Sequence, residues 1–342
     1  MKFTIAALVS TVALAATVAD AAAPKCSGGV RVRKEFRDLS AGEWSLYVSA
    51  IHTLAKKPAN DGRLAKKGYS ILEELVKIHV DNFGQIHDND IFPTWHRAFI
   101  YRFETELRKV DASISLPYWA ITADYEHPEN AYAFSDKILG GSNPLNKQLE
   151  AGCIKNGPFQ DLKYRDFGCI RRGFDAQGHV SQSIAEHNLA DQFWDSTYKA
   201  RLPSGPEVEA ILRNAGGSWA KFLDDFNYVL HASVHSFIAG SDSGTMINQH
   251  SPADPGFWFW HAWMDSVFTE WQRRNPAAAV PYLNQGLPGL GLSAGSVHSV
   301  VDMCYSYQPA GCLNPKPVPT STSTTTTKST VRSFFIFIHF SI

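Results

Sequence analysis

The chain has 342 residues, of which 44% are hydrophobic and 12% aromatic, so it can bury a core and is not an intrinsically disordered segment. Its 32 Lys and Arg residues are balanced by 33 Asp and Glu residues, which gives a formal net charge of -1. This balance offers no general attraction to nucleic-acid phosphates or anionic lipids. The composition therefore predicts no nucleic-acid partner.

The two ends of the chain differ from its middle. Residues 1–22 are typical of a secretory signal peptide, with Lys2 before a short apolar run and small residues for cleavage. Residues 23–314 form the predicted domain, which we expect to be secreted. Residues 315–342 form a Pro/Ser/Thr-rich tail with a short apolar end. That end is at the short limit of a lipid-anchor signal, and no other membrane contact is predicted.

Between these ends the apolar pattern is mainly helical. Apolar residues recur at helical spacing in five segments, which are residues 39–54, 71–80, 95–110, 218–237 and 257–274. The stretch 123–205 is rich in Gly, Asn, Asp and Pro, and we expect long loops there with one short helix near 184–198. The best of the few strand signals covers 303–307. The sequence predicts a mainly α domain with long loops and few short strands.

Five cysteines in a chain with an export signal predict disulfides rather than a thiol active site. Cys153 and Cys169 enclose a loop-like segment, so we expect them to pair. Cys26 is expected to pair with Cys304 or Cys312, and the spacing leaves both possibilities open. No C-x-x-C spacing indicates a zinc site.

Six of the thirteen histidines fall into two groups of three. The first group is His79, His87 and His96, and the second is His231, His235 and His261. In the first group, one histidine lies at the end of a predicted helix, one on the following loop and one at the start of the next helix. The second group lies on two predicted helices.

The spacing within these groups is typical of a metal site. His231 and His235 are four residues apart, which places both rings on one helix face, and His261 follows on the next helix. Three imidazoles without a thiolate or carboxylate suit copper or zinc and leave a coordination position open. The sequence predicts two such sites facing each other inside a helical bundle.

Several motifs around the histidines resemble those of one family. Residues 92–97 read FPTWHR, residues 231–235 read HASVH and residues 251–261 read SPADPGFWFWH. Further matching segments are residues 32–37 (VRKEFR), 116–119 (LPYW) and 305–307 (YSY). Together these segments resemble tyrosinases and catechol oxidases over residues 26–307, and the chain is most similar to short, secreted members of the fungal kind.

The resemblance implies a four-helix bundle around a dinuclear copper site. It assigns the first copper to the group that begins with His79 and the second to the group that begins with His231, with O2 as co-substrate and a small phenol as partner. Asp265 lies one turn after His261, and we predict that it accepts the N–H of a ligating ring. Densely spaced aromatic residues from 257 to 263 are expected to pack in the core.

The residue after His231 bears on the reaction. Family members that hydroxylate monophenols often carry Asn there, whereas this chain has Ala232, which has no polar group to hold a water. Ser236 is small and neutral, and we expect Ser236, Ala232 and Met246 to line the substrate pocket, with Met246 at its rim. The predicted activity is oxidation of ortho-diphenols or ortho-aminophenols to ortho-quinones or quinone imines, with weak or no monophenol hydroxylation.

Other functions remain open at this stage. One is a true tyrosinase, a monooxygenase that also hydroxylates monophenols. A haemocyanin-like O2-binding protein would use the same ligands without turnover. A zinc or iron hydrolase would need a carboxylate base beside the metal, as in HExxH, and neither histidine group contains one. A copper-free relative would serve only as a binding protein.

Overall fold

The computed structural model describes residues 26–187 and 193–308. The predicted signal peptide, the predicted tail and Cys312 lie outside the described residues. Within them the fold is mainly α, as predicted. The helices are α1 (Ala41–Leu54), α2 (Gly62–Lys66), α3 (Ile71–Asn82), α4 (Phe92–Arg108), α5 (Gln182–His187), α6 (Gly205–Ala215), α7 (Trp219–Asp224), α8 (Ser233–Ala239) and α9 (Pro255–Arg274).

All five predicted long helices are present, with one interruption. The segment predicted over 218–237 begins as α7 and ends as α8, but a π-helical segment, η7 (Asp225–Ala232), joins the two. The helix predicted over 184–198 is wrong for residues 193–198, which form turns and isolated bridges, while residues 188–192 lie outside the described residues. Trp194, for example, pairs with Ala200. The sequence does not predict α2 or α6, which are present as well.

Polar caps explain where the main helices begin. Ser40 caps α1 and Ser70 caps α3, each in a capping box with the glutamate three residues later. Asp254 caps α9 by accepting a hydrogen bond from Gly256 N at 2.9 Å. The same carboxylate accepts two hydrogen bonds from the buried Arg172 side chain, at 2.7 and 2.8 Å. The start of α9 is therefore held by its own cap and by Arg172, which belongs to the loop region before α5.

The described strands are short and paired in twos. β1 (Arg31–Arg33) pairs in parallel with β6 (Tyr305–Tyr307), β2 (Gly152–Cys153) pairs with β3 (Arg171–Arg172), and β4 (Gly286–Leu287) pairs with β5 (Leu292–Ser293). A disulfide joins Cys26 to Cys304 beside the first pair. These contacts hold the first and last described segments of the domain together.

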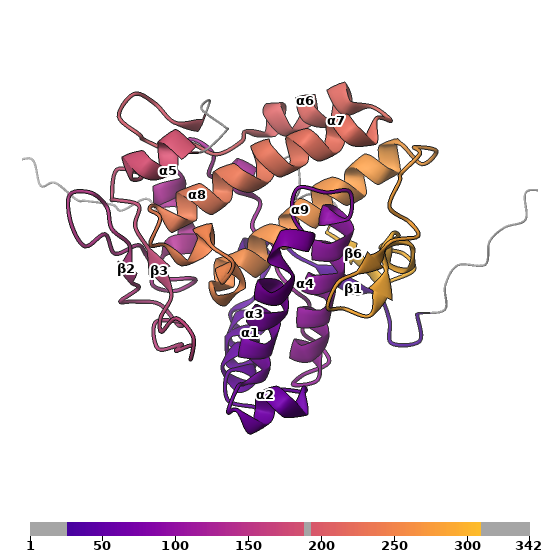
Figure 1. The fold of residues 1–342 in the computed structure, drawn as a ribbon, viewed down its shortest axis with the longest axis horizontal. Helices are drawn as coiled ribbons and strands as arrows, with labels where there is room; N and C mark the ends of the chain where they lie inside the picture. The colour runs from indigo at the N-terminus through magenta and orange to yellow at the C-terminus, as the bar shows by residue number, and fades with distance from the viewer. Residues whose placement is uncertain (1–25, 188–192, 309–342) are drawn as a thin grey trace, which may run out of the picture.

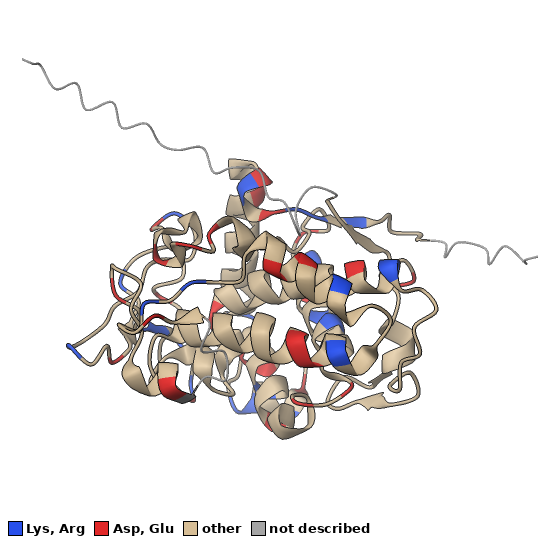
Figure 2. Ribbon diagram, turned by 90° about the horizontal axis from the view of Figure 1, so that it is seen from above, with Lys and Arg blue, Asp and Glu red and all other residues tan. Residues whose placement is uncertain are grey.

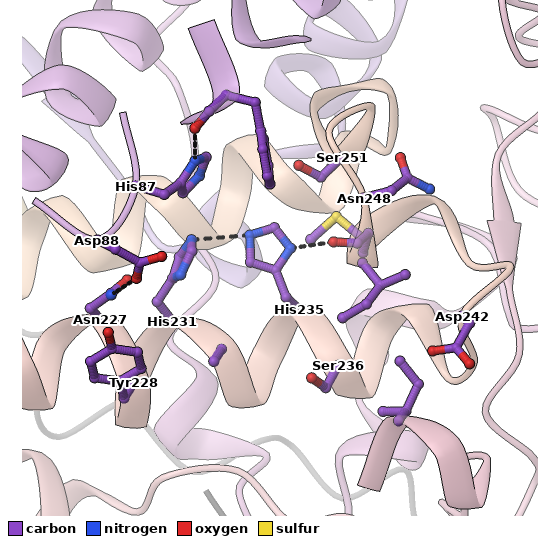
Figure 3. A pocket seen from close by; sticks show the side chains of 15 residues that line it. His87, Asp88, Asn227, Tyr228, His231, His235, Ser236, Asp242, Asn248 and Ser251 are labelled. Atoms are coloured by element: carbon purple, nitrogen blue, oxygen red, sulfur yellow. Dashed lines mark hydrogen bonds between the residues drawn. The ribbon is translucent and has the colours of Figure 1, made fainter. Parts of the chain in front are cut away.

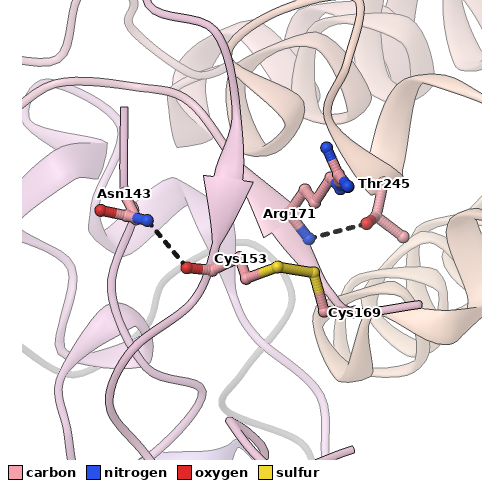
Figure 4. The surroundings of a disulfide bond; sticks show 5 residues. All are labelled: Asn143, Cys153, Cys169, Arg171 and Thr245. Atoms are coloured by element: carbon pink, nitrogen blue, oxygen red, sulfur yellow. Dashed lines mark hydrogen bonds between the residues drawn. A yellow bond between two sulfur atoms is a disulfide. The ribbon is translucent and has the colours of Figure 1, made fainter. Parts of the chain in front are cut away.

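A second disulfide, between Cys153 and Cys169, braces the long loop region (Figure 4). Asn143 Nδ2 donates to the carbonyl of Cys153 at 2.9 Å on one side of it. On the other side, Arg171 N donates to Thr245 Oγ1 at 2.8 Å. Thr245 begins the turn that carries Met246, so this brace reaches the loop that follows α8.

The helices pack around α9. Figure 1 shows α9 in the middle, with α7 and α8 above it and α1, α3 and α4 below. The predicted packing of the aromatic run on α9 is confirmed, because each of its side chains is at most 1% exposed; they are Phe257, Trp258, Phe259, Trp260 and Trp263. Within the described residues, none of the helices combines the length and apolarity needed to cross a bilayer.

Candidate metal centre

Five helical segments and one loop bring the six histidines together. His79 comes from α3, His96 from α4 and His261 from α9, while His87 lies on the loop before α4. The second group also takes one ring from η7 and one from α8. In each group the possible ligand atoms lie within 4.8 Å of one another. Both predicted groups are thus assembled, and stacking of His96 on His261, with 4.5 Å between ring centroids, places them side by side.

The π-helical segment sets the position of His231. A π turn adds one residue per turn, and such turns occur frequently at functional sites. Here it carries His231 directly before the α-helical turn of His235, and the two Nε2 atoms lie 3.1 Å apart. Trp260 stacks against the ring of His231, with 5.2 Å between centroids. Apolar packing on one side and a nearby nitrogen on the other therefore orient this ring.

Backbone carbonyls fix the rotation of the other rings. His87 Nδ1 donates to the carbonyl of Phe83, and His96 Nδ1 donates to the carbonyl of Phe92, both at 2.9 Å. His79 Nδ1 donates to the carbonyl of Gln249 at 2.8 Å. The acceptor for His235 Nδ1 is the carbonyl of Met246. Because a carbonyl only accepts, the proton sits on Nδ1 and the lone pair on Nε2 in all four rings.

Three of the Nε2 atoms are buried without any hydrogen-bond partner among the described residues, namely those of His79, His96 and His261. A buried acceptor without a partner is costly, so such atoms call for an explanation. A metal ion supplies it, because neutral imidazoles that present Nε2 are standard metal ligands and their Nδ1–H groups are normally held by acceptors. The residues present therefore fit two ions bound by histidine nitrogens.

Burial keeps these rings neutral. It lowers the pKa of all six histidines below the ordinary value, because the charged imidazolium loses its hydration. For His235 the pKa falls to about 3. Neighbouring rings lower the pKa further, and His87 makes the largest such contribution for both His79 and His96.

The stability of the metal-free protein should consequently fall in acid. A histidine whose folded pKa lies below its unfolded pKa binds fewer protons when folded, so its contribution is complete above about pH 6.5 and is lost as the pH decreases. Each such ring contributes a slope of about 1.4 kcal/mol per pH unit. The free energy of unfolding of the metal-free protein can be measured with urea between pH 6.5 and 5. It should depend less steeply on pH for His235→Gln than for the unchanged protein, by about 1.4 kcal/mol per pH unit.

The control for this experiment is His127→Gln, whose side chain is 56% exposed. This variant removes no buried imidazole, so its slope should match that of the unchanged protein. Equal slopes for His235→Gln and the unchanged protein would contradict the neutral, buried state of this ring.

A cavity of about 320 Å³ opens onto the second group (Figure 3). His231 and His235 line it, together with His87 from the first group. The predicted pocket residues Ala232, Ser236 and Met246 also line it. The predicted place of Met246 at the rim is wrong, because its side chain is 1% exposed and its carbonyl holds His235. Met246 is a buried wall residue.

Two polar contacts tie the loop of His87 to the opposite helix. Asp88 has a φ of 54°, in the left-handed region, and its Oδ1 accepts from Asn227 Nδ2 at 2.6 Å. Trp219 Nε1 donates to Asp90 Oδ1 at 2.8 Å. These residues are not among the predicted site residues, because nothing in their spacing connects residues 88–90 with residues 219–227.

Asp265 does not hold a ligating ring, contrary to the prediction. Its Oδ1 accepts from Arg97 Nε at 2.5 Å, and its Oδ2 accepts from the hydroxyls of Tyr305 and Tyr307, both at 2.6 Å. Arg33 lies 3.3 Å from the same Oδ2. Among the described residues, no hydrogen bond joins Asp265 to a histidine. The carboxylate neutralises buried guanidinium groups, while backbone carbonyls perform the predicted role.

The sequence of this chain matches a known family and individual known proteins. The family described as the common central domain of tyrosinase matches residues 48–274. A tyrosinase of Streptomyces antibioticus is 29% identical over 298 residues, which cover 81% of this chain and 92% of that protein.

Solved structures share the fold. A polyphenol oxidase variant from Thermothelomyces thermophila matches with a TM-score of 0.55 at 20% identity, over 82% of this chain and 89% of that one. A functional unit of octopus hemocyanin matches with a TM-score of 0.53 at 16% identity, over 81% of this chain and 68% of that one. At these identities the likeness concerns the fold alone.

Proposed function

The chain belongs to the tyrosinase family, and from this membership we propose that it is a copper-dependent oxidase that uses O2 to convert ortho-diphenols or ortho-aminophenols to ortho-quinones or quinone imines. The observation that carries the proposal is the pair of histidine groups with their Nε2 atoms directed inward, next to an open cavity. His79, His87 and His96 would hold one copper. His231, His235 and His261 would hold the other.

The chemistry divides between metal and protein. Bound copper supplies redox chemistry by cycling between Cu(I) and Cu(II), so that two diphenols give four electrons and four protons in all and one O2 becomes two waters. The protein keeps all six imidazoles neutral, which lets them bind both oxidation states. Carbonyls hold four of the rings in place, so little reorganisation accompanies the change of oxidation state.

Other metal chemistry has less support. A zinc or iron hydrolase of the HExxH kind carries a glutamate between its two helical histidine ligands, and no Asp or Glu stands between His231 and His235. An oxygen carrier would have to keep phenols from its metal, whereas a cavity of about 320 Å³, which is large enough for a small aromatic ring, reaches His231 and His235. Both observations favour an enzyme that admits an organic substrate.

We further propose that diphenols are preferred over monophenols. A monophenol must lose its proton before it can be hydroxylated, and Ala232 lines the cavity next to His231 without a polar group that could position water for this step. Oxygen uptake by the copper-loaded protein should therefore be fast with catechol or ortho-aminophenol and weak with a monophenol. Ala232→Asn should raise the ratio of monophenol to catechol rates by at least about tenfold.

Ser236→Asn serves as the control, because it adds the same amide one turn further along the cavity wall. The diphenol preference would be wrong if the unchanged protein oxidised a monophenol as fast as catechol without a lag. Copper binding without uptake on any substrate would instead favour the oxygen-carrier alternative.

Export of the protein remains part of the proposal. We propose that residues 1–22 are removed and that the domain of residues 23–314 is secreted. Two disulfides support this, because such bonds persist in oxidising compartments. The fungal kind stays a prediction, since the relative described above is bacterial.

A further inference from the structure

The charged residues that line the cavity beside the histidines are of one sign. Asp88 and Asp242 line it, whereas no Lys or Arg does so among the described residues. This is a local property, because Figure 2 shows blue and red residues interspersed over the ribbon as a whole.

The two carboxylates lie on opposite sides of the second histidine group. Figure 3 shows Asp88 beside Asn227 and His231, and Asp242 beyond Ser236 at the other end of the same helical run. Both side chains are exposed, which places them at the mouth of the cavity rather than at its floor. A ring that lies over His231 and His235 would therefore have a carboxylate near either end.

Within the part of the chain that the structure describes, no Lys or Arg neutralises either carboxylate. Asp88 accepts a hydrogen bond from the neutral amide of Asn227, and Asp242 accepts one from Ser183 Oγ at 2.5 Å. No ion pair within the described residues involves either of them. These hydrogen bonds hold the carboxylates in place and leave their charge available to a ligand.

The remainder of the cavity suits an aromatic ring with one charged substituent. Ile184 from α5, Phe83 from the turn after α3, and Met246 and Ile247 from the loop after α8 give it apolar walls. Such walls bind the ring but offer nothing to a charged group. A substituent on the ring must therefore extend to the mouth, where the fixed groups are acidic.

We propose that this pocket selects phenols that carry a cationic ring substituent, such as an alkylammonium group, and disfavours phenols that carry a carboxylate. Asp88 and Asp242 determine this specificity. The proposal rests on the proposed oxidase function, since it names the class of substrate for the same site. It does not depend on whether the ring bears one hydroxyl or two.

The size of the effect follows from the exposure of the two groups. Exposed ion pairs are weak, so each carboxylate should change the preference by about threefold and the two together by about tenfold. Salt should reduce the preference, because the Debye length falls from about 10 Å at 0.1 M to about 3 Å at 1 M. The effect should appear in KM more than in kcat, because the charge acts on binding.

Three catechols with a two-carbon side chain provide the test: dopamine is cationic, ethylcatechol is neutral and dihydrocaffeate is anionic. With the copper-loaded full chain, kcat/KM for dopamine should exceed that for dihydrocaffeate by about tenfold at low salt. The double variant Asp88→Asn with Asp242→Asn should bring this ratio close to one. Asp136→Asn removes an exposed carboxylate that does not line the cavity, and it should leave the ratio unchanged.

Binding gives a second readout that needs no turnover. Calorimetry with the copper-loaded protein should show tighter binding of phenethylamine than of phenylpropionate, and the double variant should lose this difference. A ratio that the double variant does not change, or a preference for the anion, would overturn the proposal. Failure of the oxidase function would appear separately, as no oxidation of ethylcatechol, while the binding preference would still test the two carboxylates.

Discussion

Replacing His261 by Gln should reduce catechol oxidation to background and lower the bound copper from about two ions per chain to about one. His261 Nε2 is buried without a hydrogen-bond partner among the described residues, so this atom serves no structural contact. The longer, flexible Gln presents an amide in place of the imidazole nitrogen. Oxygen uptake and copper content, measured on the same preparation, test this expectation.

His127→Gln is the matched control, because its ring is largely exposed and lies in neither histidine group. It should retain both copper ions and full oxygen uptake. The assignment of His261 would be contradicted if its variant kept two coppers and normal activity. Circular dichroism of both variants would show that any loss of activity is not a loss of fold.

Replacing Asp265 by Ala should destabilise the protein by about 3 to 5 kcal/mol, although the residue touches no ligating ring. Its carboxylate balances Arg97 and Arg33, whose side chains are fully buried, and it accepts hydrogen bonds from Tyr305 and Tyr307. Removal leaves guanidinium charge in the interior without an adequate counterion. Chemical unfolding of the full chain measures the loss.

Asp136→Ala, at an exposed site, is the control and should change the unfolding free energy by less than about 0.5 kcal/mol. A similarly small change for Asp265→Ala would show that the buried cluster contributes little. Copper content distinguishes the structural role from the predicted ligand-orienting one: folded Asp265→Ala protein should still bind two coppers, whereas loss of copper from a folded protein would favour contact with a ring.

Local patterns predicted the helices and the histidine groups well, because both depend on spacing along one segment. Apolar residues at helical spacing mark α3, α4 and α9, and the ligands lie on or beside these helices. The missed α6 also has a local signal: Ser204 and Glu207 form a capping box, and Pro206 stands in the first turn. The predicted loop stretch 123–205 ends at Gly205, where this helix begins.

The orientation of the ligands could not be predicted in the same way. The acceptors for His79 and His235 are backbone carbonyls of Gln249 and Met246, and every residue type has such a carbonyl. The prediction for Asp265 is wrong because it used only the one-turn spacing from His261. The guanidinium groups that bind Asp265 come from distant segments of the chain. The acidic mouth of the cavity likewise combines residues 88 and 242, which only the folded chain brings to one site.

The pairing of β1 with β6 has a consequence for synthesis of the protein. Arg33 and Tyr307 are 274 residues apart, yet both contribute to the cluster around Asp265. While the chain is being made, Arg33 and Arg97 emerge early, and the two tyrosines that complete the cluster follow Asp265 by 40 and 42 residues. The nascent domain therefore cannot finish its charged interior until β6 has left the ribosome, and a chain that stops before Tyr305 should be recognised by chaperones as incomplete.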